Sequence, residues 1–426
     1  MSLIQKNIFN NGISVITEEM PDVESSCVGI WVPAGSRNET RENNGISHFI
    51  EHLLFKGTAR RTALDISREI ESVGGMLNAF TGREMTCFYA KVLNKDLPLA
   101  IDLLSDIFLH SKFDKAEMEK ERLVVLQEIK MVEDTPDDLI HDLFAERFWK
   151  GHAIGRSVLG TTANIKRIGR DGALGYFTRH YRGAGVFIAA AGGFKTKGVV
   201  KLLKETFGRL RLRQGGVVKD GPASFAGSRL IKKDLEQVHL CMGVPAPEQC
   251  HPDRFKVYLI NTMLGSGMSS RLFQEIREKR GLAYSVYSYL SLCRDAGSLV
   301  AYAGTSKESF PEVVALMLKE FARLGKGVGK DELANAKEQL KGGMLLGLET
   351  SDSRMTKLAR DEFYFGRHVP VKEIVRGINK VTLKDISETA RRLFNPELVT
   401  LVAMGRVSKN GLPKRLQAAD KQGASL

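Results

Sequence analysis

Two histidines and a glutamate lie within five consecutive residues near the start of the chain, in the order His48, Glu51, His52. On a helix, residues four apart project from one face a single turn apart, so both imidazoles can bind one divalent ion. Zinc is the usual choice for nitrogen ligands of this kind. Glu51 lies beside the same face, where its carboxylate can reach a metal-bound water without being a ligand. The spacing therefore predicts a helical metal site with an adjacent general base.

The alternative interpretation is an amphipathic helix that carries two histidines by chance. The chain has only nine histidines in 426 residues, so this spacing around a glutamate is an infrequent coincidence. The metal site is the favoured interpretation.

A catalytic zinc ion needs a third protein ligand and one open position. The helix expected at residues 114–133 offers several carboxylates for it: Glu117, Glu119, Glu121, Glu128 and Glu133. Glu128 stands out because the apolar residues between 123 and 129 predict a buried face, on which a carboxylate needs a cation. Glu121 lies two turns earlier on the same face, where it would orient a ligand. Spacing alone gives Glu128 only a modest preference over its neighbours.

The elements that must position these side chains belong to a duplicated pattern. Residues 148–193 and 363–406 both contain two aromatic residues, a turn, an amphipathic helix and an apolar strand that ends on glycine. The separation between Tyr181 and Phe394 equals that between Gly192 and Gly405, so the two copies keep one register. The pattern predicts two homologous α+β halves, each a mostly antiparallel sheet packed with helices.

Alternating and amphipathic patterns predict the same order of elements upstream in each half. In the first half, strands are expected at 12–18 and 26–33 as a pair, helices at 45–56 and 64–73, strands at 76–81 and 85–92, and helices at 95–110 and 114–133. In the second half, strands are expected at 228–234 and 237–244, helices at 253–264 and 269–279, strands at 283–291 and 297–304, and helices at 308–324 and 330–348. The predicted domains are a metal-bearing half at 1–212, a glycine-rich linker at 213–225, a second half at 226–407 and a frayed tail at 408–426.

The arrangement of His48, Glu51 and His52, followed by Glu128 on the later helix, resembles the pitrilysin family of zinc peptidases. The order His-x-x-Glu-His is the inverzincin signature. The most similar branch includes the β-subunit of the mitochondrial processing peptidase and its bacterial relatives, and the likeness covers nearly the whole chain. It implies that His48, His52 and Glu128 are zinc ligands, that Glu51 is the general base and that Glu121 is a supporting carboxylate.

Two further segments fit this family. Residues 74–81 resemble its substrate-binding edge strand, although the sequence alone favours an ordinary turn and strand there. An exposed edge can bind an extended peptide by main-chain hydrogen bonds. The strand residues implied as substrate contacts are Asn78, Ala79, Phe80 and Thr81. Arg277 and Tyr284 match the family's Arg-x6-Tyr pair, which implies that they hold the substrate near the metal.

The resemblance also implies how the chain works as an enzyme. Residues 257–264, the counterpart of the metal helix in the second half, contain no histidine or carboxylate, so one active site is expected in each chain. The implied assembly is a clamshell homodimer in which Arg277 and Tyr284 act on the zinc site of the partner. The expected function is zinc-dependent endopeptidase activity on unfolded peptides or presequence-like segments inside a chamber. The alternative is a non-catalytic peptide-binding or assembly subunit of the same fold.

Composition excludes several other classes of function. The formal net charge is +13, but the basic residues are dispersed among acids and no aromatic–basic motif is present, so nucleic-acid binding is not expected. Five scattered cysteines without a CxxC pair predict reduced thiols. No apolar stretch approaches the roughly 20 residues that span a bilayer, and the start of the chain lacks a targeting pattern. We therefore expect a cytoplasmic protein that does not bind membranes.

Overall fold

A computed structural model describes residues 3–183, 185–210, 212 and 221–417 of the chain. They form two compact units, each composed of segments from both halves of the sequence. The described residues of unit 1 fall within Met1–Met131, Arg156–Val218 and Leu346–His368, and those of unit 2 fall within Val132–Gly155, Lys219–Leu345 and Val369–Leu426.

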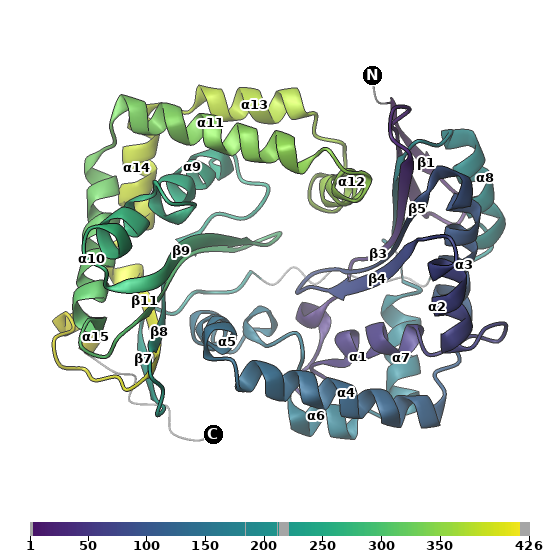
Figure 1. The fold of residues 1–426 in the computed structure, drawn as a ribbon, viewed down its shortest axis with the longest axis horizontal. Coiled ribbons are helices and arrows are strands. Elements are labelled where there is room, and N and C mark those ends of the chain that lie inside the picture. The colour runs from purple at the N-terminus through teal and green to yellow at the C-terminus, as the bar shows by residue number, and fades with distance from the viewer. Residues whose placement is uncertain (1–2, 184, 211, 213–220, 418–426) are drawn as a thin grey trace. The chain divides into compact units, whose positions relative to one another are not determined.

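Unit 1 contains a six-stranded sheet in the order β1-β2-β6-β3-β5-β4. Its strands are β1 (Leu3–Ile8), β2 (Ser14–Glu19), β3 (Ser25–Val32), β4 (Met76–Thr81), β5 (Thr86–Leu93) and β6 (Phe187–Gly192). Only β2 and β6 pair in parallel, and β4 is an edge strand. Its helices are α1 (Ile46–Leu54), α2 (Ala63–Glu71), α3 (Leu97–His110), α4 (Lys115–Glu133), α6 (Thr162–Arg167), α7 (Arg170–His180), α8 (Thr196–Phe207) and α12 (Ser351–Phe365). In Figure 1, α3 and α8 lie together beside this sheet.

Helices cover both faces of this sheet, which explains why β3 is apolar along most of its length. Val28 and Ile30 point into the core formed with α1, α3 and α8. Cys27 and Trp31 point to the opposite face, where they pack with Met355 of α12. Because successive strand residues face opposite sides of a sheet, a strand buried on both sides needs apolar residues at nearly every position.

Unit 2 contains a five-stranded sheet in the order β7-β11-β8-β10-β9. Its strands are β7 (Gly227–Lys232), β8 (Val238–Ala246), β9 (Ala283–Leu292), β10 (Gly297–Thr305) and β11 (Thr400–Gly405). One face packs on α9 (Arg254–Gly265), α10 (Phe310–Lys326) and α14 (Leu383–Leu393), and the other on α5 (Pro136–Phe148). Further helical segments of this unit are a π-helical turn at Phe273–Glu278, α11 (Lys330–Gly347), α13 (Val371–Lys380) and α15 (Lys414–Gln417).

The topology confirms the predicted pair of homologous α+β halves. The order β2-β6-β3-β5-β4 in unit 1 matches β7-β11-β8-β10-β9 in unit 2, and each sheet has one parallel pair at the equivalent place. Strands β6 and β11 begin at Phe187 and Thr400, which keep the same separation as the repeated glycines at their ends. The two units also exchange one helix each, because α12 of the second half packs on the first sheet and α5 of the first half packs on the second.

Several expectations differ from the structure. The predicted pairing of residues 12–18 with 26–33 was wrong, because β6 lies between β2 and β3. Of the predicted linker, residues 213–220 lie outside the described part, and 221–225 form no helix or strand. The predicted frayed tail contains α15, whose Leu416 is buried, and 418–426 lie outside the described part. Among the described residues, no helix combines the length and apolar character needed to cross a bilayer.

Candidate metal centre and active site

Helix α1 is held at its N-terminus by a carboxylate from outside the helix. The buried side chain of Glu39 accepts hydrogen bonds from the backbone N–H of Gly45 (2.8 Å) and of Ser47 (2.9 Å). These are donors that the first turn of a helix leaves without intrahelical partners, and the carboxylate also complements the helix dipole. Gly45 has a φ of 98°, and a Cβ there would lie 2.6 Å from the carbonyl oxygen of Leu159. A glycine is therefore required where the metal helix begins.

His48 and His52 project from the same face of α1, with ring centroids 4.7 Å apart. The Nδ1 atom of His52 lies 3.0 Å from Oε2 of Glu121 on α4. Because a carboxylate accepts this hydrogen bond, His52 carries its proton on Nδ1 and presents the lone pair of Nε2. Burial, and to a lesser extent the neighbouring His52, lowers the pKa of His48 to about 4. His48 is therefore neutral at pH 7, as a metal ligand must be.

Helix α4 brings Glu128 to the two imidazoles. Oε2 of Glu128 lies 3.5 Å from Nε2 of His48 and 3.5 Å from Nε2 of His52. Arg122 connects α4 to α1 and to the end of α6. Its guanidinium lies 5.3 Å from the ring centroid of Phe49 on α1 and donates to the carbonyl oxygens of Ile165 and Ile168.

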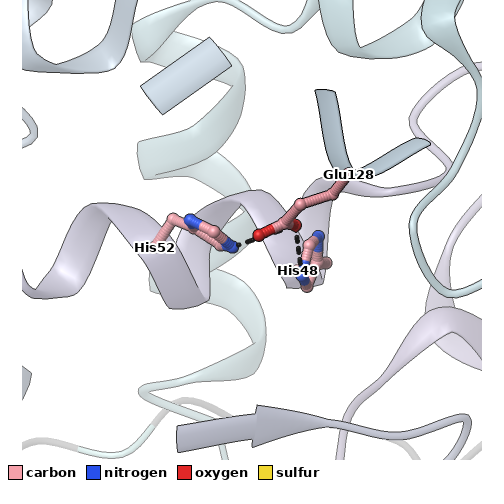
Figure 2. Close-up of side chains that lie close together, drawn as sticks. All are labelled: His48, His52 and Glu128. Atoms are coloured by element: carbon pink, nitrogen blue, oxygen red, sulfur yellow. Dashed lines mark ion pairs between the residues drawn. The ribbon is translucent and has the colours of Figure 1, made fainter. Parts of the chain in front are cut away.

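The three side chains fit a zinc ion (Figure 2). Their ligand atoms all lie within 4.8 Å of one another. Zinc bonds of about 2.0 Å at tetrahedral angles place neighbouring donor atoms roughly 3.3 Å apart, close to the nitrogen–oxygen separations found here. Direct hydrogen bonds would be shorter, about 2.7–3.2 Å. Two neutral imidazoles and one carboxylate are also a donor set that zinc accepts in catalytic sites, with a fourth position open.

Glu51 lies on α1 between the two histidines and is bonded to the edge strand β4. The hydroxyl of Thr81 donates to Oε2 of Glu51, while Oε1 has no hydrogen-bond partner among the described residues. Burial raises the pKa of Glu51, against the opposing effects of the Thr81 hydrogen bond and of His52, and Glu128 raises it further. A carboxylate with a raised pKa and one free oxygen is suited to accept a proton near neutral pH.

Strand β4 forms one of the two edges of the sheet in unit 1. Asn78 and Phe80 are exposed on one face, and Ala79 and Thr81 are partly buried on the other. The backbone N–H of Ala79 donates to Oδ1 of Asn78 (2.8 Å). Phe80 packs edge-on against Trp31 yet remains 41% exposed, which leaves an apolar surface beside the strand edge.

Arg277 and Tyr284 belong to unit 2 and contact each other. The guanidinium of Arg277 lies 4.7 Å from the ring centroid of Tyr284, and Tyr284 is 79% exposed. Arg277 lies in the π-helical turn Phe273–Glu278, where an α-helix was expected, and Tyr284 lies on the edge strand β9. Local π-helical geometry is frequent at functional sites.

Two residues at the centre were not among the predictions, and one predicted buried face of α4 was wrong. Leu123 and Val124 were expected on the buried face of α4 but are 66% and 42% exposed, because the buried stripe passes through Met118, Glu121, Arg122, Val125 and Ile129. The two residues are Glu39, at the start of α1, and Lys56, whose Nζ lies 2.7 Å from Oε1 of Glu121. The position of Lys56, one helical turn after His52, was an available signal, whereas nothing in the sequence marked Glu39.

Comparisons with protein families agree with this geometry. Residues 14–162 match the insulinase (peptidase family M16) model, and residues 167–340 match the peptidase M16 inactive domain. All three residues of the candidate metal cluster, together with Glu51, fall within the first match. Among the described residues, no second cluster of this kind is present.

Individual relatives cover nearly the whole chain. A Bacillus subtilis protein named uncharacterized zinc protease YmxG is 38% identical over 410 residues, which are 96% of this chain and 99% of that protein. A Mycobacterium bovis protein also named an uncharacterized zinc protease is 40% identical over 415 residues, 96% of this chain and 94% of that protein. A solved protease from Helicobacter pylori shares the fold, with a TM-score of 0.88 at 21% identity, over 95% of this chain and 100% of that chain. The resemblance inferred from the sequence is thus confirmed, and the chain belongs to peptidase family M16, the insulinase family of zinc peptidases.

Proposed function

We propose that the protein is a zinc-dependent endopeptidase that cleaves unfolded peptides or presequence-like segments. The observation that carries the proposal is the joint placement of a zinc donor set, His48, His52 and Glu128, beside a carboxylate with a free oxygen, Glu51. A zinc donor set by itself could hold a structural ion, and a buried carboxylate by itself could serve only the stability of the fold. Together they are what metal-assisted hydrolysis of a peptide bond requires.

The peptide binds as an added strand along the free edge of β4. Main-chain hydrogen bonds of this type supply affinity without demanding a particular sequence. A carbonyl of the bound peptide replaces Oδ1 of Asn78 as the acceptor for the N–H of Ala79, while Phe80 offers apolar contact to a side chain. Thr81, at the end of the strand, bonds to Glu51 and so sets the distance between the bound peptide and the base.

Zinc, when bound, supplies a Lewis acid that polarises the scissile carbonyl and makes water more acidic. Glu51 accepts the proton of the attacking water on Oε1 and returns a proton to the leaving amine. Glu121 holds the proton of His52 on Nδ1, which keeps Nε2 aimed at the metal position. Thr81 keeps the Glu51 carboxylate in one orientation throughout.

Arg277 and Tyr284 complete the site from the second half of a partner chain. A guanidinium and a phenol are both donors, so they can hold the substrate backbone and stabilise the negative charge that develops on its carbonyl oxygen. The functional unit is then a homodimer that encloses a chamber, which admits unfolded chains and excludes folded proteins.

Cleavage of an internally quenched fluorescent peptide, with and without a chelator, tests the proposal. We expect cleavage by the zinc-loaded protein, loss of cleavage after chelation and recovery when zinc is restored. A protein that binds peptide and zinc without cleaving any member of a peptide library would instead be a non-catalytic binding or assembly subunit.

A further inference from the structure

Lys56 completes a chain of three charged or polar groups that ends at the metal centre. Its Nζ lies 2.7 Å from Oε1 of Glu121, and Oε2 of the same carboxylate lies 3.0 Å from Nδ1 of His52. Both oxygens of Glu121 are therefore engaged, one by a cation and one by a metal ligand. The Glu121 side chain is only 8% exposed, so its charge depends on these partners instead of on water.

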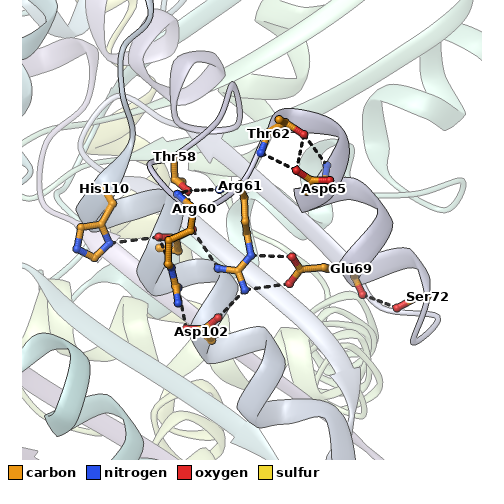
Figure 3. Close-up of polar contacts among 10 residues, drawn as sticks. Thr58, Arg60, Arg61, Thr62, Asp65, Glu69, Ser72, Asp102 and His110 are labelled. Atoms are coloured by element: carbon orange, nitrogen blue, oxygen red, sulfur yellow. Dashed lines mark hydrogen bonds and ion pairs between the residues drawn. The ribbon is translucent and has the colours of Figure 1, made fainter.

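The loop that begins at Lys56 is fastened to α3 (Figure 3). Thr58 donates from Oγ1 to Asp106 (2.7 Å) and pairs through its backbone with Ser111. Arg60 and Arg61 both donate to Asp106, whose side chain is fully buried. The backbone from which Lys56 extends is therefore held by several buried or charge-assisted contacts.

This rigid attachment distinguishes the Lys56–Glu121 ion pair from an ordinary surface ion pair. A lysine on a mobile loop loses side-chain entropy when it pairs, and such pairs contribute little. Here the loop is already ordered by the Asp106 contacts, and the partner carboxylate is already buried against α1. Pairing of Nζ with Glu121 therefore costs less conformational entropy than pairing of a lysine on a mobile loop. For this reason the Lys56 side chain can hold the carboxylate of Glu121 in one position.

We propose that Lys56 is a positioning residue of the metal centre, which holds the Glu121 carboxylate in the orientation that aims His52 at the metal. Without the cation, the buried carboxylate can rotate toward other donors or toward solvent, and the His52 ring loses its fixed direction. The inference rests on the proposed zinc site and adds to it a residue that touches neither the metal nor the substrate.

The test compares zinc affinity, measured by competition with a chromophoric chelator, across matched variants. Lys56→Met should weaken zinc binding roughly tenfold, the lower end of the effect of losing a group that orients a ligand. Lys56→Arg should recover most of the affinity because it restores the charge. Lys6→Met is the control, since it removes a 2.7 Å lysine–carboxylate pair with Glu362 in the same unit without contact to the centre.

A double-mutant cycle separates positioning through Glu121 from general destabilisation. If Lys56 acts only through that carboxylate, Lys56→Met combined with Glu121→Gln binds zinc no more weakly than Glu121→Gln alone. The absorption spectrum of bound cobalt(II), which reports ligand geometry, should change in Lys56→Met and not in Lys6→Met.

The outcomes distinguish this inference from the proposed function. The zinc site itself would be rejected if the wild-type protein bound no zinc, or if His52→Ala bound zinc with the wild-type affinity. A wild-type protein that binds zinc, together with a Lys56→Met variant of equal affinity and unchanged cobalt spectrum, overturns only the role of Lys56. Additive losses in the double-mutant cycle would also reject it, because they would show that Lys56 acts independently of Glu121.

Discussion

Replacement of Glu51 by glutamine separates the proposed chemistry from metal and substrate binding. Glutamine has the same shape, and its amide oxygen can still accept the hydrogen bond from Thr81 that fixes the carboxylate. The amide has no oxygen that can take a proton at neutral pH. The Glu51→Gln variant therefore removes one function, proton transfer at the free Oε1 position, while the contacts of Oε2 survive.

The size of the effect follows from the place of Glu51 in the structure. A positioned general base contributes roughly a hundredfold to ten-thousandfold. Glu51 lies on the same helix as both histidines, the charges of His52 and Glu128 shift its pKa, and its Oε1 has no hydrogen-bond partner among the described residues. We expect a fall in kcat of about a thousandfold, equivalent to about 4 kcal/mol of transition-state stabilisation. KM should change little, because β4 remains intact. Zinc content should also persist, since Glu51 is not part of the ligand cluster.

The assay is cleavage of the quenched fluorescent peptide, with zinc content measured by elemental analysis on the same samples. Glu19→Gln is a suitable control, because it makes the same chemical change at a partly buried carboxylate of unit 1 that bonds the backbone of Thr196. Cleavage by Glu51→Gln at close to the wild-type rate would refute Glu51 as the base. Loss of zinc from the variant would show instead that Glu51 helps to hold the metal.

Three further predictions address the metal, the assembly and the support of the site. His52→Ala should release the zinc, of which about one ion per chain is expected, and elemental analysis checks this. If the partner chain completes each site, mixing inactive Glu51→Gln and Tyr284→Phe homodimers should restore up to half of the wild-type activity per dimer, and no recovery after confirmed subunit exchange would argue against it. Asp106→Ala should lower the free energy of unfolding by about 3 kcal/mol in urea denaturation. Burial opposes ionisation of Asp106, yet hydrogen bonds from Thr58, Arg60 and Arg61 hold the pKa of its carboxyl below the usual value. The contribution of Asp106 to the free energy of unfolding is therefore present at neutral pH and is lost as the pH falls through that lowered pKa.

Most individual elements could be predicted because their signals are local. Strand β4 has the predicted bounds of 76–81, and helix α4 begins one position later than expected and ends where expected. The order of the strands in the sheet was harder to predict from the sequence. Residues 12–18 and 26–33 were expected to pair as neighbours in sequence, but β6, which follows much later in the chain, lies between them. Local alternation gives the face of a strand and contains no information on a partner so distant.

Helices α5 and α12 were not among the predicted elements, and their places in the fold also depend on contacts that are distant in sequence. Helix α12 belongs to the second half of the sequence yet packs on Trp31 and Cys27 in the sheet of unit 1. The internal repeat predicts two similar halves, and it does not predict that each would supply a helix to the other unit. That exchange depends on which apolar face lies open when both halves are folded, a property of tertiary packing.

Some residues of the candidate site could be predicted from local spacing, whereas others depend on contacts between residues that are distant in sequence. His48, Glu51 and His52 lie on one helical face, so their spacing sufficed to predict them. Glu128 was selected by an apolar run, part of which is exposed in the structure, and by the resemblance to the family. Lys56 was missed because its role depends on Glu121, a carboxylate on a helix much later in the chain.

The charges of the centre explain why these residues belong together. With all four groups ionised, Glu51, Glu121 and Glu128 would carry three negative charges and Lys56 one positive charge, which would leave two negative charges among partly or largely buried groups. Glu128 is already among the causes that raise the pKa of Glu51, the effect expected of carboxylates held close together. Carboxylates remain ionised in such a place only when a cation compensates them. A divalent ion between His48, His52 and Glu128 would supply the two missing positive charges. The balance therefore favours a divalent metal over a monovalent ion. It also assigns Lys56 to Glu121, a carboxylate that bonds to His52 while lying outside the candidate metal cluster.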